Sequence, residues 1–227
     1  QRKIQESESI EVPSFSKVIQ YIKNNWEVYG AIIIGNSCLI ILLYGLQSWV
    51  STMLLRVYEW DLVQSGRVYG SIAMLAGSAG VLSGPFVLKY MSKINVNAPH
   101  FKLAIFGISM ASLSLVLLPF QPNVNIALVF VTMASFFVTL PLAGTSSAMV
   151  IVSPNRIRGV ITGIYVVVTS VFGLVLGPFL VASSTDFIFQ DTNAVAKSLA
   201  LVSILVGPIG IFFMYKGINS FGEMKNV

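Results

Sequence analysis

Long apolar stretches separated by short polar joints dominate the hydrophobic pattern of this chain. Each stretch approaches the ~20 residues that a helix needs to cross the hydrocarbon core of a bilayer. The pattern predicts transmembrane spans at residues 28–55, 63–88, 101–118, 125–150, 160–181 and 194–215.

The residues before the first span are polar at first and then amphipathic. Phe15, Val18, Ile19 and Ile22 fall on one helical face, which predicts a short surface helix over 14–23 with Ser14 as its amino-terminal cap. The chain starts at Gln1 and shows no apolar leader before Glu11. We therefore expect it to begin inside a longer protein rather than at a signal peptide.

Composition supports a membrane environment, because 55% of the residues are hydrophobic and 10% are charged. Globular domains carry roughly 25% charged residues. The net charge of +5 comes without a basic helix or a basic-aromatic cluster, which argues against nucleic-acid binding. Cys38 is the single cysteine, so an internal disulfide and a multi-cysteine metal site are excluded. No cofactor and no metal are expected.

The distribution of cations predicts the orientation of the chain in the membrane. Of the 14 lysine and arginine residues, all but Arg56, Arg67 and Lys197 fall on the side that carries both termini. Membrane proteins retain such an excess of cations in the cytoplasm. We therefore predict a multi-pass protein of the plasma (bacterial inner) membrane with both termini cytoplasmic.

The second and fifth predicted spans resemble each other, since residues 64–91 align without gaps to residues 157–184. The matched pairs are Gly66 and Gly159, Gly70 and Gly163, Gly80 and Gly173, Gly84 and Gly177, and Pro85 and Pro178. Small residues at this spacing are common in membrane helices, so chance is the competing explanation. Units of three spans would insert with opposite orientations, as the inverted repeats of transporters do.

The predicted fold is therefore an all-α membrane protein, a six-transmembrane-helix bundle made of two inverted three-helix repeats. Residues 1–27 form a cytoplasmic segment with the short amphipathic helix. Residues 28–118 form the first repeat, residues 119–216 the second, and residues 217–227 a cytoplasmic tail.

Polar residues gather on narrow faces of the first, fourth and fifth spans. Inside a membrane, polar groups face the bundle interior or a wet cavity. Two explanations stay open: these faces line a solute pathway, or they only form hydrogen bonds between helices. The candidate pathway residues are Asn36, Tyr44, Gln47, Ser48, Thr132, Ser135, Thr139, Ser146, Thr162, Tyr165 and Thr169.

Small residues form a separate stripe on the second span, and we assign this stripe to tight helix packing. The residues assigned to packing are Gly70, Gly77, Gly80 and Gly84, together with Gly173 and Gly177 of the fifth span. Gly77→Leu should then disrupt folding or transport.

Arg67 lies near the outer end of the second span. It is either a contact for an anionic solute group or an interfacial arginine paired with Glu59 or Asp61.

Acidic residues lie outside the predicted spans: Glu59, Asp61, Asp186 and Asp191 are all near the outer surface. The only histidine, His100, falls in an inner loop. Proton coupling usually needs an ionisable group inside the membrane, so we expect any coupling site in a half of the protein that is missing here. The sequence also lacks a catalytic constellation, so an enzyme is not expected.

Several strings resemble one known family. They are Tyr44-Gly45 with Trp49, Arg56-x-Tyr58-x-Trp60 followed by Gln64-x-Gly66, Pro154-Asn155-Arg156-x-Arg158-Gly159, Gly173-x-x-x-Gly177-Pro178, and Thr185-Asp186-Phe187. Together with the six spans, they resemble the carboxyl-terminal half of a major facilitator superfamily transporter, and in particular the bacterial Spinster-like branch. Ser51 stands where that family often has a proline, and Leu88-Lys89-Tyr90 lacks the acid of the usual loop motif.

The resemblance implies a twelve-span secondary transporter that moves a small organic or lipid-like solute by alternating access. Its expected partners are the solute, an amino-terminal six-helix half of the same transporter, and the lipid bilayer. Spinster-like members are linked to lysolipids and sphingoid phosphates in animals, and the wider superfamily moves sugars, organic anions and drugs. The alternative is a six-span receptor or scaffold that does not transport.

Overall fold

The computed structural model describes residues 15–225, with side chains described as far as Phe221. Within this range, six helical spans are long and apolar enough to cross a membrane, as predicted. A short helix precedes them: α1 covers Phe15–Asn24, whereas its predicted cap, Ser14, lies outside the described residues. The spans are α2 (Trp26–Val57), α3–η1–α4 (Leu62–Ile72, Ala73–Gly77, Ser78–Lys93), α5–η2 (Pro99–Leu117, Leu118–Phe120), α6–α7 (Val124–Thr139, Leu142–Val152), α8–η3 (Arg158–Ser183, Ser184–Phe189) and α9 (Val195–Lys225).

The helix boundaries follow local chemistry. Asp61 begins α3 by accepting hydrogen bonds from the N–H groups of Val63 and Gln64, at 2.8 and 2.9 Å. Pro141 separates α6 from α7, because proline has no N–H to continue the helical ladder. The sixth span continues as α9 to Lys225, beyond Tyr215 where we expected the span to end.

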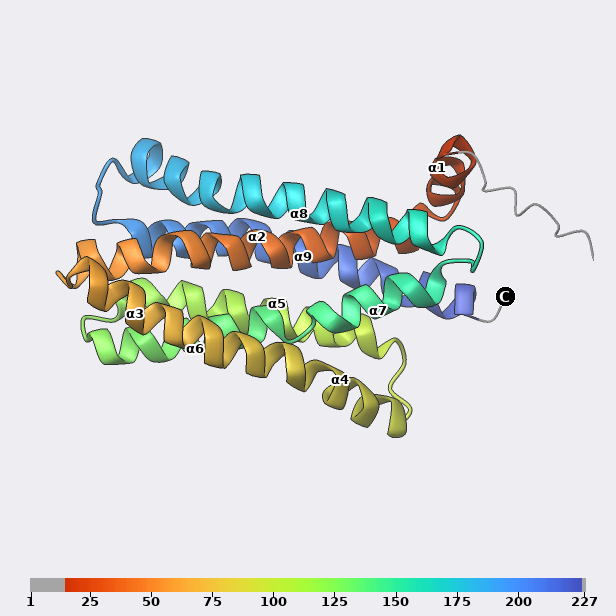
Figure 1. Ribbon diagram of the computed structural model, residues 1–227, viewed down its shortest axis with the longest axis horizontal. Coiled ribbons are helices and arrows are strands. Elements are labelled where there is room, and N and C mark those ends of the chain that lie inside the picture. The colour runs from red at the N-terminus through yellow and green to blue at the C-terminus, as the bar shows by residue number, and fades with distance from the viewer. Residues whose placement is uncertain (1–14, 226–227) are drawn as a thin grey trace, which may run out of the picture.

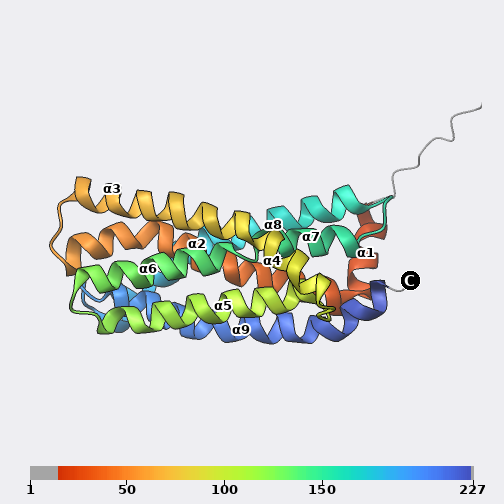
Figure 2. The ribbon, with the colours of Figure 1, turned by 90° about the horizontal axis from the view of Figure 1, so that it is seen from below.

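The spans lie side by side along the long axis of the molecule (Figures 1 and 2). α2 is the central helix, with 78% of its most apolar stretch buried against its neighbours. Its large side chains Leu39, Leu46 and Met53 are inaccessible and form the middle of the core. The second and fifth spans are the least covered, with 17% and 28% of the corresponding stretches buried.

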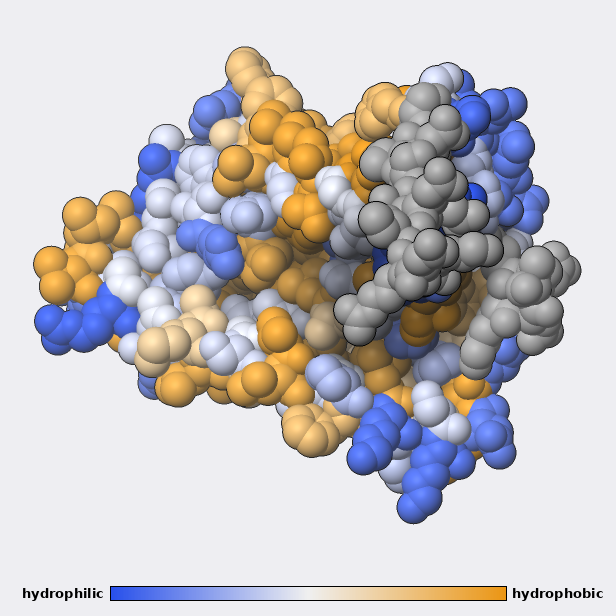
Figure 3. Space-filling model, turned by 45° about the vertical axis from the view of Figure 1, so that its right-hand side comes forward, coloured by the Kyte–Doolittle hydropathy of each residue, from blue (hydrophilic) through white to orange (hydrophobic). Residues whose placement is uncertain are grey.

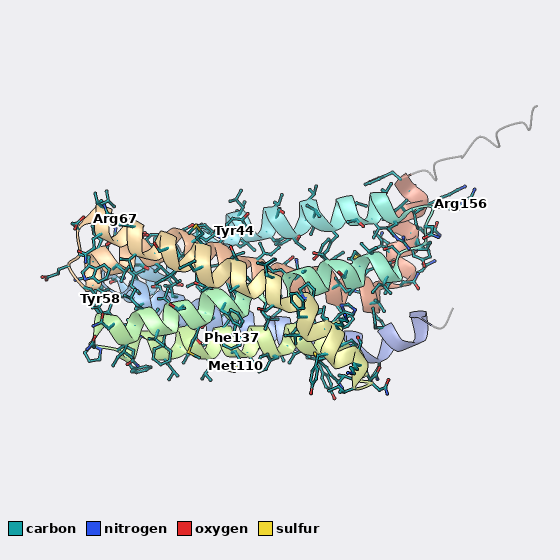
Figure 4. The ribbon with its side chains drawn as sticks, turned by 60° about the horizontal axis from the view of Figure 1, so that its bottom comes forward. Tyr44, Tyr58, Arg67, Met110, Phe137 and Arg156 are labelled. Carbon is teal, nitrogen blue, oxygen red and sulfur yellow. The ribbon has the colours of Figure 1, made fainter. Side chains whose placement is uncertain are left out.

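The second and fifth spans run in opposite directions along the bundle, as an inverted repeat requires (Figure 1). α1 and the end of α9 lie at the same end of the bundle, which we call the α1 end. Figure 3 brings this end forward and shows hydrophilic residues gathered around it. Figure 4 places Arg156 at the α1 end and Arg67 at the opposite end, which we call the Arg67 end.

Candidate functional site

The candidate site is a cavity of about 490 Å³ between the first, second and fourth spans. Sequence reasoning selected three of its polar residues as pathway residues, Gln47, Ser135 and Thr139, and the structure brings them together here. Tyr69 and Ser78 of the second span add further polar groups. The remaining lining residues are Leu43, Ala73, Gly77, Val81, Leu82 and Leu142, so most of the wall is apolar.

Ser135 is a buried polar residue of this cavity. Its side chain is 4% exposed, and its hydroxyl oxygen has no hydrogen-bond partner among the described residues. A buried hydroxyl without a partner costs about 1–3 kcal/mol, which singles out Ser135 among the residues that line the cavity.

Thr139 behaves differently, because its hydroxyl already has partners. Its oxygen lies 2.9 Å from the carbonyl oxygen of Ser135 and 3.0 Å from that of Gly77. The second contact joins the fourth span to the second across the edge of the cavity.

The cavity wall on the second span contains the π-helical turn Ala73–Gly77. Such turns are frequent at functional sites, since they change which side chains and carbonyl groups a helix presents. An added Cβ at Gly77 would meet only the Cγ2 of Thr139, at 4.0 Å, among the described residues. Gly77 therefore lines the cavity, in place of the tight helix contact that we expected.

A second group of predicted residues meets between α2, α7 and α8. The side-chain oxygen of Asn36 accepts a 2.7 Å hydrogen bond from the hydroxyl of Thr145, and both residues are buried. Nearby, the hydroxyls of Ser146 and Tyr165 are 3.3 Å apart. Thr145 was missed by sequence reasoning because it falls outside the polar stripe of the fourth span. These contacts favour helix association at this point over solute binding.

The other predicted pathway residues are not brought into the cavity. Thr132 and Thr169 donate to carbonyls of their own helices, Leu128 at 2.7 Å and Tyr165 at 2.8 Å. The Thr162 hydroxyl is buried and has no partner among the described residues. Tyr44 is half-buried against Gly173 and Gly177, and Ser48 is exposed.

Two predicted packing glycines of the second span lie in close helix contact. An added Cβ at Gly80 would collide with the hydroxyl of Thr139 and the carbonyl of Phe136. At Gly84 it would collide with the carbonyl of Leu140, next to the break between α6 and α7.

The matching glycines of the fifth span make the same kind of contact with α2. A Cβ at Gly173 would collide with Ile40, and one at Gly177 would lie 2.7 Å from the carbonyl oxygen of Ile41. In each repeat, therefore, the middle helix packs through its Gly-x-x-x-Gly against the first helix of the other repeat.

The earlier glycines of both copies face open space. For Gly66, Gly70, Gly159 and Gly163, no atom of the described residues lies within 4 Å of an added Cβ. Gly70 therefore makes no tight contact within the described part of this chain, which differs from our expectation. Large apolar residues on the same spans, such as Phe86 and Phe179, are also exposed.

Arg67 is exposed at its end of the bundle, on the same side as Tyr58 (Figure 4). Asp61, one of its proposed partners, instead uses its carboxylate to cap α3. The Tyr58 hydroxyl donates a 2.7 Å hydrogen bond to the carbonyl of Gln121. This bond joins the segment between the first and second spans to the segment between the third and fourth spans. Burial raises the pKa of Tyr58, so this hydroxyl keeps its proton at neutral pH.

Comparison with known proteins identifies the family of this chain and solved structures that share its fold. A family model described as the Major Facilitator Superfamily matches residues 2–178. A bacterial homologue of the human lysosomal transporter Spinster, in an inward-facing and unoccupied conformation, matches with a TM-score of 0.68 and 12% identity. That match covers 97% of this chain and 52% of the bacterial protein.

The same kind of bacterial homologue in an inward-facing, occupied conformation matches with a TM-score of 0.59 and 14% identity, over 88% of this chain and 49% of that one. This chain therefore spans about half the length of these solved structures. No curated protein matches the chain.

Proposed function

The chain belongs to the major facilitator superfamily, and on this premise we propose that it is the carboxyl-terminal half of a secondary transporter. It is an integral, multi-pass membrane protein. The proposed activity is movement of a small organic or lipid-like solute by alternating access. The observation that carries this proposal is the cavity between the first, second and fourth spans, with its unpartnered Ser135 hydroxyl.

The cavity supports a solute with a substantial apolar part. Its described lining has no charged side chain, and its polar groups are hydroxyls and the amide of Gln47. Apolar walls with a few placed polar groups are typical of small-molecule sites. A solute that buries a hydrocarbon portion and offers a donor or acceptor to Ser135 and Gln47 fits this lining.

The exposed second and fifth spans support docking of a second, amino-terminal six-helix half. Both spans are poorly covered by the rest of this chain, and both present glycines that face open space. Small residues at membrane helix interfaces allow two backbones to approach closely. A partner half on this face would also cover the open side of the cavity, because Tyr69, Gly77 and Leu82 of the second span form its wall.

The remaining parts of the proposal concern orientation and coupling. We propose that the α1 end is cytoplasmic, because the predicted inner cations include Arg156, which lies at that end (Figure 4). We place proton coupling, if the transporter uses it, in the other half. Asp186 of this chain is exposed in η3 at the far end of the fifth span.

The competing proposal, a six-span receptor or scaffold, lacks a comparable observation in its favour. The family is one of transporters, and this membership also argues against an enzyme. The test is uptake by proteoliposomes that contain the full-length protein, with lysolipids and organic anions as candidate solutes, with and without a proton gradient. An absence of substrate-dependent flux under every gradient would overturn the proposal.

Gly77→Leu sharpens this test, because a leucine at that position would extend into the cavity. We expect it to abolish uptake while the protein keeps its thermal unfolding temperature. Gly77→Ala is the matched control, since its Cβ meets only an ordinary contact with Thr139. Retained uptake in Gly77→Leu would remove this cavity from the solute path.

A further inference from the structure

A second cavity, of about 400 Å³, lies between the first turns of α2 and the last turns of α9. It shares no lining residue with the solute cavity and lies at the α1 end of the bundle. Trp26, Glu27, Phe213, Lys216, Asn219 and Ser220 are the lining residues that matter here.

Opposite charges line the two walls of this cavity. Glu27 on α2 supplies a carboxylate, and the Ser220 hydroxyl on α9 donates a 2.7 Å hydrogen bond to its Oε2. Lys216 on α9 supplies an ammonium group, which lies over the ring of Phe212 at 5.5 Å from its centroid. One cavity thus offers a fixed acceptor for a cation and a donor for an anion, which suits a ligand that carries both charges.

The cavity also has an aromatic and apolar side. The indole ring of Trp26 lies along the helix over Gly30, where an added Cβ would be 2.7 Å from its Cε2 atom. Ala31 and Phe213 continue the apolar wall toward the middle of the two spans. A ligand with a charged end and a hydrocarbon end would place the first among Glu27, Lys216 and Asn219 and the second along this wall.

The position of the cavity identifies the source of such a ligand. Both walls belong to membrane spans, Trp26–Val57 and Val195–Phe221, and the charged residues sit at their ends. This is the level of lipid headgroups, where tryptophan and lysine are enriched in membrane proteins. A zwitterionic molecule held at this level between two spans is a phospholipid of the adjacent leaflet.

We propose that this cavity binds the headgroup of an aminophospholipid, such as phosphatidylethanolamine. Lys216 and Asn219 donate to the phosphate oxygens, and the Glu27 carboxylate, oriented by Ser220, accepts hydrogen bonds from the primary ammonium. Phosphatidylglycerol lacks the ammonium, and phosphatidylcholine has no N–H to donate. The site is therefore selective for the primary amine. This inference does not depend on the proposed transport activity.

The test measures lipid binding to the full-length protein in detergent, by mass spectrometry of the intact complex and by the shift in thermal unfolding temperature. We expect phosphatidylethanolamine to bind more tightly than phosphatidylglycerol or phosphatidylcholine. Glu27→Gln should weaken phosphatidylethanolamine roughly tenfold or more, because a charge-assisted hydrogen bond is lost, and leave phosphatidylglycerol unchanged. Lys216→Gln should weaken both of these lipids.

Matched controls are Glu59→Gln, an exposed acid beyond the other end of α2, and Lys197→Gln near the start of α9. Neither should change any lipid affinity. Ser220→Ala removes the hydrogen bond that orients the Glu27 carboxylate but leaves the carboxylate itself in place. We expect this variant to prefer phosphatidylethanolamine over phosphatidylcholine less strongly than the unchanged protein does. Equal binding of the three lipids, or an unchanged preference in Glu27→Gln, would overturn the proposal. If soluble phosphoethanolamine raises the unfolding temperature as much as the lipid does, the ligand is a free zwitterion, and that result would also overturn the proposal.

Discussion

The indole nitrogen of Trp49, on α2, donates a 3.0 Å hydrogen bond to the carbonyl oxygen of Pro178, on α8. Gly177, the residue before this proline, lies directly against the backbone of α2 at Ile41 and Gly45. The close approach of the two helices is what brings the indole within reach of the carbonyl. One side chain thus joins the first helix of one repeat to the middle helix of the other.

Trp49→Phe tests this link, because it removes the donor and keeps most of the aromatic surface. We expect a loss of about 1 kcal/mol in the free energy of unfolding, the usual net value of one hydrogen bond. Thermal unfolding of the purified protein in detergent measures the change. Trp60→Phe, beyond the end of α2, is the control, and an equal loss in both variants would contradict the assignment.

Gly80→Ala and Gly70→Ala should have different effects on stability. The new Cβ at Gly80 collides with Thr139 and with the backbone of Phe136, and overpacking of this kind costs about 1–3 kcal/mol. At Gly70 the described residues leave the Cβ position open, so the isolated chain should tolerate alanine. Equal unfolding temperatures for the two variants would refute the packing that we describe.

These two glycines also show how far the sequence could predict the structure. Six apolar stretches of the right length were enough to predict the spans, since bilayer thickness fixes helix length. The glycine repeat indicated that the second and fifth spans are related. It could not separate Gly80, in close contact, from Gly70 and Gly77, because a stripe of small residues looks the same whether a helix, a cavity or a partner faces it.

The sequence also could not show which polar residues of the predicted faces line the cavity. Ser135 and Thr169 both lie on predicted polar faces, yet the Thr169 hydroxyl is satisfied by its own helix at Tyr165 and that of Ser135 is not. Tyr69 was missed because its face of the second span was assigned to packing. The π-helical turn at Ala73–Gly77 could not be predicted from its own residues, because Ala-Met-Leu-Ala-Gly is equally compatible with an ordinary α-helix.

Ser135→Ala should weaken solute affinity without weakening the fold. The hydroxyl has no partner to lose among the described residues, so the unfolding temperature should stay the same or rise slightly. Loss of one hydrogen bond to the solute, about 0.5–1.5 kcal/mol, predicts a KM roughly 2- to 13-fold higher. Ser109→Ala on α5 is the matched control, since that hydroxyl bonds to the carbonyl of Ile105 at 2.8 Å. An unchanged KM in Ser135→Ala would exclude contact with the solute.

Thr145→Val should destabilise the protein more than Thr132→Val. It leaves the buried side-chain oxygen of Asn36 without its 2.7 Å donor, and an orphaned buried polar group costs about 1–3 kcal/mol. Thr132 bonds only to its own helix, at Leu128, so its loss strands no side chain of another span. Denaturation of both variants in the same detergent gives the comparison, and a smaller loss in Thr145→Val would contradict it.

Asp186→Asn should leave any proton dependence of transport intact. The fifth span extends through η3 to Phe189 and so contains Asp186, in contrast to our expectation that acids lie outside the spans. Its carboxylate is nevertheless exposed in the last turns of that span, whereas coupling groups lie in the interior of the membrane. Uptake by the full-length variant with and without a pH gradient checks this. Loss of the gradient effect would place the coupling site in this half.

The open glycines are Gly66 and Gly70 in α3 and Gly159 and Gly163 in the first turns of α8, and these two helices begin at opposite ends of the bundle (Figure 1). A companion domain seated over the second and fifth spans would meet bare backbone at either membrane surface. At these positions no described side chain of this chain would stand between its backbone and that of the companion. In the proposed transport cycle, the opposite directions of the second and fifth spans would therefore leave the same room for the companion half at both ends of the bundle.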